Sequence, residues 1–308
     1  MSSSSPFPSG QDRAAAVTRL RAAGCVFAED EARLLISAAR TPAGLAELVD
    51  RRAAGQPLEH VLGWADFCGL RIAVDPGVFI PRRRTEFLVR RAAALARRAA
   101  APARPGPARQ DPAHQDPALQ DPALQDPAHQ DPARLRAVVV VDLCCGSGAV
   151  GAALAATLGQ VELHAADVDP AAVRCARRNV AAAGGRVYQG DLYAPLPARL
   201  RGRVDILAAN VPYVPTGEVG LLPAEARAHE PRAALDGGAD GLDVLRRAAA
   251  GAPLWLAPGG HLLVETSERQ AARAAEAVGR DGLIPRVAHS GRLNATIVIG
   301  TRPPGPGD

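Results

Sequence analysis

The chain has 308 residues, of which 47% are hydrophobic, a length that suits one or two domains with a sizeable core. Arginine supplies all the basic side chains, because lysine is absent, and the formal net charge is only +4. So small an excess gives no reason to expect a nucleic-acid partner. No stretch approaches the roughly 18 continuous apolar residues of a membrane span, and the N-terminus has no apolar signal core. We therefore expect a cytoplasmic protein without membrane contact, and a monomer.

The five cysteines are irregularly spaced along the chain, at Cys25, Cys68, Cys144, Cys145 and Cys175. Their number is odd, and the adjacent pair Cys144 and Cys145 is unsuited to a structural disulfide or a zinc knuckle. We expect reduced thiols and no metal site.

The first 64 residues predict a short lead and a small domain. Residues 1–10 are rich in serine and proline, and we expect them to be disordered. Residues 11–64 are expected to form a helical domain, because alanine and leucine recur there at helical spacing. The expected helices are Asp12–Ala23, Glu31–Ala39 and Pro42–Ala54. Their buried stripe would contain Leu34, Leu35, Leu45 and Leu48, and their caps would be Asp30 and Thr41.

A hairpin is expected over residues 65–84, linking this domain to the rest of the chain. Its strands would be Phe67–Val74 and Val78–Ile80, because side-chain polarity alternates around the turn signal Asp75-Pro76-Gly77. A helix from about Thr85 to Ala99 is expected to open the larger domain, residues 85–308.

Residues 100–134 differ from the rest of the chain. From Gln110 to Arg134 the sequence holds five tandem copies of a five-residue unit, Gln-Asp-Pro-Ala followed by His, Leu or Arg. A proline in every unit prevents both a helix and a central strand. The unit also has too little apolar surface to offset the entropy of ordering. We expect a disordered loop inserted into the larger domain.

From Ala137 onward, predicted strands alternate with predicted helices. The strands are Ala137–Leu143, Val161–Ala166, Arg186–Gln189, Val204–Ala209, Gly260–Glu265, Ile284–His289 and Ala295–Gly300. The helices are Ala149–Leu158, Pro170–Ala183, Gly241–Ala250 and Glu268–Val278. Such alternation is typical of a mostly parallel sheet covered by helices. The fold class is therefore α/β, with a seven-stranded Rossmann-like sheet that binds its ligands at the carboxyl ends of the strands.

A glycine-rich loop, Asp142–Gly148, closes the first buried strand and opens a helix. Gly146 and Gly148 let the backbone turn tightly and approach a ligand. Asp167 ends the second strand, where a carboxylate can accept hydrogen bonds from ribose hydroxyls. Asp191 and Leu192 follow the third strand, where a side-chain oxygen can receive an adenine amine. These positions predict a cofactor that contains a nucleoside.

Two kinds of cofactor suit this arrangement. In a dinucleotide site Gly151 would be the third glycine, but the Asp142 carboxylate would face a pyrophosphate unfavourably. Beside the positively charged amino group and sulfonium of S-adenosylmethionine, the same carboxylate is favourable. We therefore predict S-adenosylmethionine and a class I methyltransferase fold. The predicted cofactor-binding residues are Asp142, Cys144, Gly146, Gly148, Asp167, Asp191, Leu192 and Asn210.

Two residues near this site are given lesser roles. Cys144 is expected to touch the cofactor without acting as a nucleophile. Asp169 precedes Pro170 and is expected to cap a helix rather than to bind a ligand.

The predicted acceptor site is Asn210-Val211-Pro212-Tyr213, which follows the fourth buried strand at the same edge of the sheet. The Asn210 side-chain oxygen and the Val211 carbonyl can each accept one N–H of a planar amide or amine. Tyr213 can stack on the planar group. Two such acceptors would hold the nitrogen lone pair toward the methyl group, so positioning and charge placement would supply most of the catalysis.

These residues resemble the protein N5-glutamine methyltransferases that modify peptide-chain release factors. The likeness extends from about Gly55 to Gly300, apart from the repeats. Its further motifs are Pro57–Gly63 with Phe67, Phe79–Arg82 with Thr85 and Glu86, Glu230-Pro231, Ala234–Gly238 and Asp240–Leu242. The resemblance implies methylation of a glutamine side-chain amide in a release factor. It also implies N-terminal helices that grip this protein and an acceptor pocket lined by Arg82 and Glu86.

Three departures from the family pattern bear on the substrate. Val211 stands where the family usually has proline, which adds an N–H and loosens the backbone. Arg83 and Arg84 replace Pro-Glu and are expected to make the approach to the pocket more basic. Cys144 and Cys145 replace small or polar residues of the cofactor loop.

Two other functions are weighed against glutamine methylation. Methylation of adenine N6 or a similar amine in nucleic acid uses the same acceptor motif, but it needs an electrostatic track and a site for a flipped base. A non-catalytic cofactor-binding or scaffold protein, with the repeats as a binding tail, is a further alternative, and the intact Asn210 and Tyr213 argue against loss of catalysis.

Deletion of residues 110–134 tests the assignment of the repeat as a loop. We expect the melting temperature and the methyl-transfer rate to stay nearly unchanged, because the entropy of closing a long loop varies slowly with its length. Thermal unfolding and a turnover assay of the deleted and full chains check this. A large fall in melting temperature would show that the repeat is structural.

Overall fold

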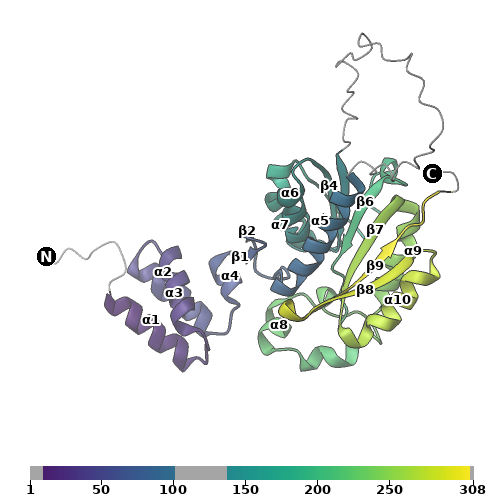
Figure 1. Cartoon of the computed structure of the whole chain (residues 1–308). Helices are drawn as coiled ribbons and strands as arrows, with labels where there is room; N and C mark the ends of the chain where they lie inside the picture. Colours follow the sequence, from purple (N-terminus) through teal and green to yellow (C-terminus); the bar gives the residue numbers. More distant parts are fainter. Residues whose placement is uncertain (1–9, 101–136, 306–308) are drawn as a thin grey trace, which may run out of the picture.

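The computed structural model describes residues 10–100 and 137–305 (Figure 1). The expected lead, apart from Gly10, and the expected repeat loop, apart from Ala100, lie outside the described residues. None of the described helices is both long and apolar enough to cross a membrane.

The N-terminal region folds as a helical unit set to one side of the sheet (Figure 1). Its helices are α1 (Gly10–Ala22), α2 (Ala28–Ala38), α3 (Pro42–Ala53) and α4 (Leu58–Leu62). Of the predicted stripe, Leu35 and Leu45 are fully buried, whereas Leu34 and Leu48 are only half-buried.

One of the two predicted caps is confirmed. The Thr41 side chain accepts a hydrogen bond from the Gly44 backbone N–H at 3.0 Å, so Thr41 is the N-cap of α3. The prediction for Asp30 was wrong, because α2 begins earlier, at Ala28, after Phe27. Asp30 lies in its first turn, where its carboxylate pairs with Arg33.

A hairpin connects the two regions, but its strands differ from the predicted ones. They are β1 (Trp64–Phe67) and β2 (Leu70–Ala73), which pair in antiparallel fashion. The turn between them is Cys68-Gly69, and both residues have positive φ, 51° and 77°, as the tight turns favoured in hairpins require.

The predicted strand Val78–Ile80 is absent from the structure because its backbone groups find side-chain partners instead. The Val78 carbonyl lies 2.9 Å from His60 Nε2. The Ile80 N–H donates to the buried carboxylate of Glu230 at 3.1 Å. The sequence 75–77 does form a turn, since the Val78 N–H donates to the Asp75 carbonyl.

The larger domain is built on a seven-stranded sheet of order β5-β4-β3-β6-β7-β9-β8. Its strands are β3 (Val138–Leu143), β4 (Val161–Asp167), β5 (Arg186–Gln189), β6 (Val204–Ala209), β7 (Leu256–Thr266), β8 (Ile284–Ser290) and β9 (Ala295–Thr301). β9 runs antiparallel to both of its neighbours, and the pairs among β5, β4, β3, β6 and β7 are parallel. The predicted mostly parallel sheet is confirmed.

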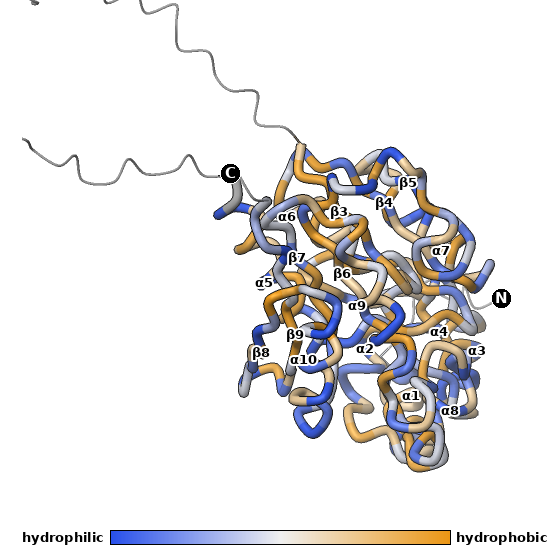
Figure 2. The backbone as a smooth tube through the Cα atoms, turned by 90° about the vertical axis from the view of Figure 1, so that its right-hand side faces the viewer, coloured by the Kyte–Doolittle hydropathy of each residue, from blue (hydrophilic) through white to orange (hydrophobic). Residues whose placement is uncertain are grey.

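Helices cover both faces of the sheet (Figure 1). The covering helices are α5 (Glu86–Ala100), α6 (Ala149–Leu158), α7 (Pro170–Val180), α9 (Asp243–Trp255) and α10 (Ala271–Arg280). A further short helix, α8 (Ala224–His229), lies between β6 and α9 in the chain and has no buried residues. Val140 packs with α5, α6 and α7 on one face, while Val139 and Val141 pack with α9 and α10 on the other. This alternation explains why β3 is a continuous valine run. Figure 2 shows the hydrophobic strands inside and more hydrophilic segments around them.

The strand order changes direction between β3 and β6. From β3 the chain proceeds through β4 to β5 at one edge and then returns to β6 on the other side of β3. Their register sets Leu143 opposite Ala209. The loop after each strand therefore begins at the same edge of the sheet, at the switch point where open α/β sheets bind their ligands.

Candidate functional site

A cavity of about 420 Å³ lies at this switch point, and we call it the cofactor cavity. It brings together most of the residues predicted to bind the cofactor. Those that line it are Asp142, Cys144, Gly146, Asp167, Asp191, Leu192 and Asn210. Gly148 does not line it but stands at the N-terminus of α6 with φ of 76°. A Cβ on Gly148 would lie 3.1 Å from the Ala176 Cα, so glycine is required there for close packing on α7.

Asp142 is buried at the base of the cofactor cavity. Its Oδ2 accepts a hydrogen bond from the Gly151 N–H at 2.8 Å, which ties α6 to β3. Burial raises the pKa of this carboxyl to about 8, and the nearby Asp167 adds to the effect, while the Gly151 N–H opposes it. A positively charged group entering the cavity would favour the ionised form of Asp142.

Asp167 is held by two backbone donors. Its Oδ2 accepts from the Gly146 N–H at 2.8 Å, and its Oδ1 accepts from the Asp169 N–H at 2.9 Å. Burial raises its pKa against these hydrogen bonds. A carboxylate oxygen can accept more than one hydrogen bond, so Asp167 retains capacity for hydroxyls in the cavity. Asp169 caps α7 through the Ala171 N–H at 2.8 Å, and it also lines the cavity.

Asp191 and Leu192 also line the cavity. The Asp191 carboxylate is largely exposed and is ion-paired with Arg247, which also lines the cavity. Leu192 is buried and has a positive φ of 47°. Burial raises the pKa of the Cys144 thiol, so that side chain stays neutral and is a poor nucleophile.

The cavity suits the predicted cofactor on two counts. Among the described residues, its titratable lining includes four aspartates and one arginine, an acidic set that favours a cation over a polyphosphate. It also contains Thr85, whose buried hydroxyl has no partner in the described chain and can donate to a ligand carboxylate. S-adenosylmethionine has a net positive charge and a carboxylate.

A second cavity, of about 390 Å³, adjoins the first, and we call it the acceptor cavity. The two cavities share Phe79, Asn210 and Ala234 in their walls. Val211 and Tyr213 line the acceptor cavity, and Pro212 lines the cofactor cavity. Asn210 stands in the common wall, and its side-chain amide has no hydrogen-bonding partner among the described residues.

Two arginine–glutamate pairs lie in the acceptor cavity. Both oxygens of the buried Glu230 carboxylate accept from Arg82 Nη2 at 2.6 Å. Glu265, also buried, accepts from Arg84 Nε at 3.0 Å and from the Tyr213 hydroxyl at 3.1 Å. Arg84, one of the two arginines expected to make the approach basic, is therefore neutralised by Glu265. The other, Arg83, is exposed and lines neither cavity.

Two residues were predicted to line the acceptor pocket, and only one of them does so. Arg82 lines the acceptor cavity, as expected for a substrate-binding residue, while Glu86 lines neither cavity. The Glu86 carboxylate instead pairs with Arg90 and accepts from the Cys68 N–H.

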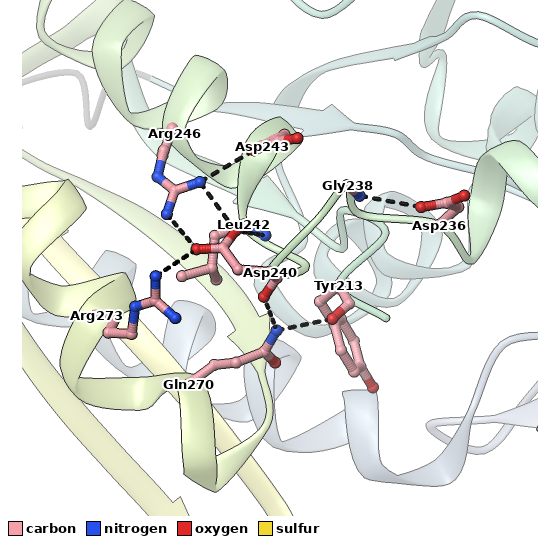
Figure 3. Close-up of polar contacts among 9 residues, drawn as sticks. All are labelled: Tyr213, Asp236, Gly238, Asp240, Leu242, Asp243, Arg246, Gln270 and Arg273. Carbon is pink, nitrogen blue, oxygen red and sulfur yellow. Dashed lines mark hydrogen bonds and ion pairs between the residues drawn. The ribbon is translucent and has the colours of Figure 1, made fainter. Parts of the chain in front are cut away.

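The acceptor loop, residues 210–213, is held in place by the segment after β7 and by the loop of residues 237–241. Gln270 Nε2 donates to the carbonyls of Tyr213 and Asp240, both at 2.9 Å (Figure 3). The Asp240 carboxylate is in turn held by Arg246 and Arg273, as the same view shows. A Cβ on Gly237 would lie 2.6 Å from the Pro212 carbonyl oxygen, so the glycine allows the two loops to touch.

Several residues of the site were not assigned a role from the sequence. Glu265 and Arg84 meet only because β7 ends beside the segment that follows the hairpin. The signal for Glu265 was available, since a polar residue at the carboxyl end of a buried strand is a candidate site residue. Glu59 and Glu225 also line the acceptor cavity, which gives it four glutamates and two arginines in the described chain.

Comparisons with known proteins identify relatives of this chain. A model of the methyltransferase small domain matches residues 131–235. The release factor glutamine methyltransferase of Geobacter sulfurreducens is 37% identical over 73% of this chain, and the match spans 65% of that relative, just under two thirds. The enzyme of the same name from Mycolicibacterium smegmatis is 36% identical over 82% of this chain and 78% of the relative.

A relative named for a different activity matches to a similar extent. The 4-amino-L-phenylalanine/4-methylamino-L-phenylalanine methyltransferase of Streptomyces pristinaespiralis is 34% identical over 85% of this chain and 78% of that protein.

Replacement of Asp142 by asparagine tests the role of its charge. Asparagine keeps the oxygen that accepts from Gly151 and loses the carboxylate, so we expect affinity for S-adenosylmethionine at pH 8 to fall about 10- to 100-fold. In the wild type, binding below pH 8 should release a proton, and affinity should rise from pH 6 to pH 8. Calorimetry in buffers of different ionisation enthalpy measures both effects. Equal affinities of the two proteins at pH 8 would contradict the assignment.

The same variant should alter the pH dependence of stability. The raised pKa means that folded Asp142 keeps its proton up to about pH 8, whereas the unfolded chain releases it near 3.8. This group therefore favours folding less as pH rises through that window. The free energy of unfolding of Asp142→Asn, relative to wild type, should increase from pH 5 to pH 8.

Replacement of Gly241 by alanine tests the support of the acceptor loop. Gly241 has φ of 77°, and a Cβ there would collide with the Tyr213 carbonyl and with Gln270 Nε2. We expect methyl transfer to fall by about 100-fold, because small displacements of a positioned group cost that much, while cofactor affinity is retained. Gly217→Ala is the control, since a Cβ there meets nothing within 4 Å. Equal turnover by both variants would show that the support is unimportant.

Proposed function

Because the chain belongs to the release factor glutamine methyltransferase family and is an S-adenosylmethionine-dependent methyltransferase, we propose that it methylates a glutamine side-chain amide in a peptide-chain release factor. The observation that carries the proposal is the position of Asn210, whose unpaired amide stands in the wall common to the two cavities. A substrate group that enters the acceptor cavity and binds Asn210 therefore lies next to the cofactor cavity.

Each cofactor residue has a separate part in this proposal. S-adenosylmethionine supplies an electrophilic methyl group on its sulfonium. Asp142 balances positive charge at the base of the cavity, and Asp167 accepts hydrogen bonds from the ribose hydroxyls. Asp191, Leu192 and Cys144 enclose the remainder, and Gly146 and Gly148 allow the backbone to turn beside it.

The acceptor residues hold the amide nitrogen. Asn210 Oδ1 and the Val211 carbonyl accept its two N–H groups, which directs the lone pair away from them and toward the cofactor cavity. Tyr213 lies against the planar amide. Its ring is fixed by the hydrogen bond to Glu265, and burial raises the pKa of its phenol, so the hydroxyl remains neutral. Catalysis in this arrangement comes from position and charge placement.

Valine at position 211 is compatible with this function. Its side chain is 1% exposed and packs in the core with Leu143 and Ala209. That packing constrains the loop where the family's usual proline would do so through its ring. The contact needed from this residue is a backbone carbonyl, which valine also has.

The acceptor cavity favours a protein substrate over nucleic acid. With glutamates outnumbering arginines in its described lining, the cavity repels phosphates. Pro57 and Glu59, from the start of α4 and the residue before it, contribute to the lining. The N-terminal domain therefore takes part in forming the cavity, as is suitable for recognition of a partner protein.

A second candidate acceptor is a small aromatic amine. The relative that acts on 4-amino-L-phenylalanine matches as much of this chain as the release factor enzymes do. An arylamine also has a planar nitrogen with N–H groups, which suits Asn210 and the Val211 carbonyl equally.

Labelled methyl donor tests the proposal directly. The purified protein is incubated with release factor, a ribosomal protein, DNA and 4-amino-L-phenylalanine side by side. We expect label on one glutamine of the release factor, located by mass spectrometry. Label on DNA or on the free amino acid alone would replace the proposal with the corresponding alternative.

Asn210→Ala serves as the matched inactive variant. It should lower methyl transfer by at least about 100-fold, because the acceptor nitrogen loses its orientation. Calorimetric affinity for the cofactor should persist, since the predicted charged and ribose contacts are unaltered. Normal turnover by Asn210→Ala would refute the assignment of the acceptor site.

A further inference from the structure

Glu265 has one carboxylate oxygen that the fold leaves unused. Its Oε1 accepts from Arg84 and from Tyr213. Its Oε2 is buried and has no hydrogen-bonding partner among the residues that the structure describes. The Glu265 side chain is only 3% exposed, and it lines the acceptor cavity. A buried carboxylate oxygen without a donor is costly, which indicates that a ligand supplies one.

Glu230, the other arginine-paired carboxylate of the acceptor cavity, has no oxygen without a donor. Both oxygens of Glu230 are engaged by Arg82, and Oε1 also accepts from the Ile80 N–H. Glu230 is as deeply buried as Glu265, with a side chain 1% exposed. Burial and an arginine partner are therefore common to both, and the free oxygen distinguishes Glu265.

The register of the sheet brings Glu265 next to Asn210. Ala209 is opposite Val264 in the parallel pair of β6 and β7, so Asn210 and Glu265 follow at the next position of each chain. Ala208 and Leu263, two residues earlier, pack on the face that α5 covers, and the same alternation directs Asn210 and Glu265 to that face. Neighbouring strands are about 4.8 Å apart, so one substrate residue can reach both side chains.

We propose that Glu265 is a positioning residue for the substrate, and that its Oε2 accepts the main-chain N–H of the residue whose side chain is methylated. This inference rests on the proposed function. A peptide that inserts a glutamine side chain beside Asn210 also takes its own main-chain N–H out of water, and that donor needs an acceptor. In the described lining of the acceptor cavity, Glu265 Oε2 is the buried side-chain oxygen that lacks a donor.

This hydrogen bond makes the site favour a peptide over a ligand that lacks a main-chain N–H. Arg84 compensates the charge of Glu265, so the free oxygen suits a neutral N–H as well as a cation. The Tyr213 hydroxyl is bound to the other oxygen of the same carboxylate. One group thus orients both the ring that stacks on the amide and the main chain that carries it.

The test combines a protein variant with a change in the substrate. Glu265→Gln keeps the shape of the side chain but presents an NH₂ group where the free oxygen lies. Two synthetic peptides around the acceptor glutamine are compared, one with the normal amide and one with an ester, which replaces the glutamine main-chain N–H by oxygen. Initial rates with labelled donor give kcat/KM for each protein with each peptide.

The expected result is a coupled loss. Wild type should prefer the amide over the ester peptide by roughly tenfold, and Glu265→Gln should lose about 10- to 100-fold on the amide peptide and show no preference. Glu230→Gln, the matched control, removes an equally buried charge from the same cavity and should retain the amide preference. Retained preference in Glu265→Gln, or none in wild type, would overturn the inference while the methylation activity stands.

Failure of the proposed function is recognised separately. If wild type labels neither peptide nor release factor, both proposals fall. If it labels 4-amino-L-phenylalanine instead, and Glu265→Gln raises the KM for it, the free oxygen binds an α-ammonium group and the peptide assignment is overturned.

Discussion

The backbone hydrogen bonds that pair β3 with β6 set the position of both halves of the site. Because Leu143 is opposite Ala209, the cofactor loop and the acceptor loop leave the sheet side by side. Asp142 lies below one loop and Asn210 at the start of the other, and the cavities that they line share a wall. The register of two parallel strands thus sets the two cavities side by side, independently of the side chains that line them.

The same principle operates one strand further along. The pairing of β6 with β7 puts Glu265 beside Asn210, and the loop after β7 provides Gln270, which binds the Tyr213 carbonyl. The acceptor loop is therefore supported from the sheet and from the Gly237–Gly241 loop, whose glycines permit backbone contact. A loop held on two sides can present a carbonyl in a fixed direction even where valine replaces proline.

How far the sequence predicted this molecule depends on how local each signal is. The sheet was predictable, because strands buried on both faces are apolar runs such as Val138–Leu143, and their ends are marked by glycine and aspartate. The residues predicted to bind the cofactor were chosen as positions at strand ends, and most of them line one cavity. The hairpin was not, because the Ile80 N–H is taken by Glu230, 150 residues away. No local pattern contains that information.

The acceptor cavity shows the same limit in its charges. Arg84 was interpreted from the sequence as added basic charge, yet its partner Glu265 comes from a strand 181 positions later. Arg82 and Arg84 are each matched to a buried glutamate from a distant part of the chain, so these two arginines add fixed hydrogen-bond geometry to the cavity without net positive charge. Breaking either pair would leave a buried carboxylate uncompensated, which is more costly than the pair is stabilising. The pairs therefore hold Arg82 over the Phe79 ring and Arg84 over the Tyr213 ring in the cavity walls. Unlike Glu230, Glu265 leaves one oxygen without a donor among the described residues.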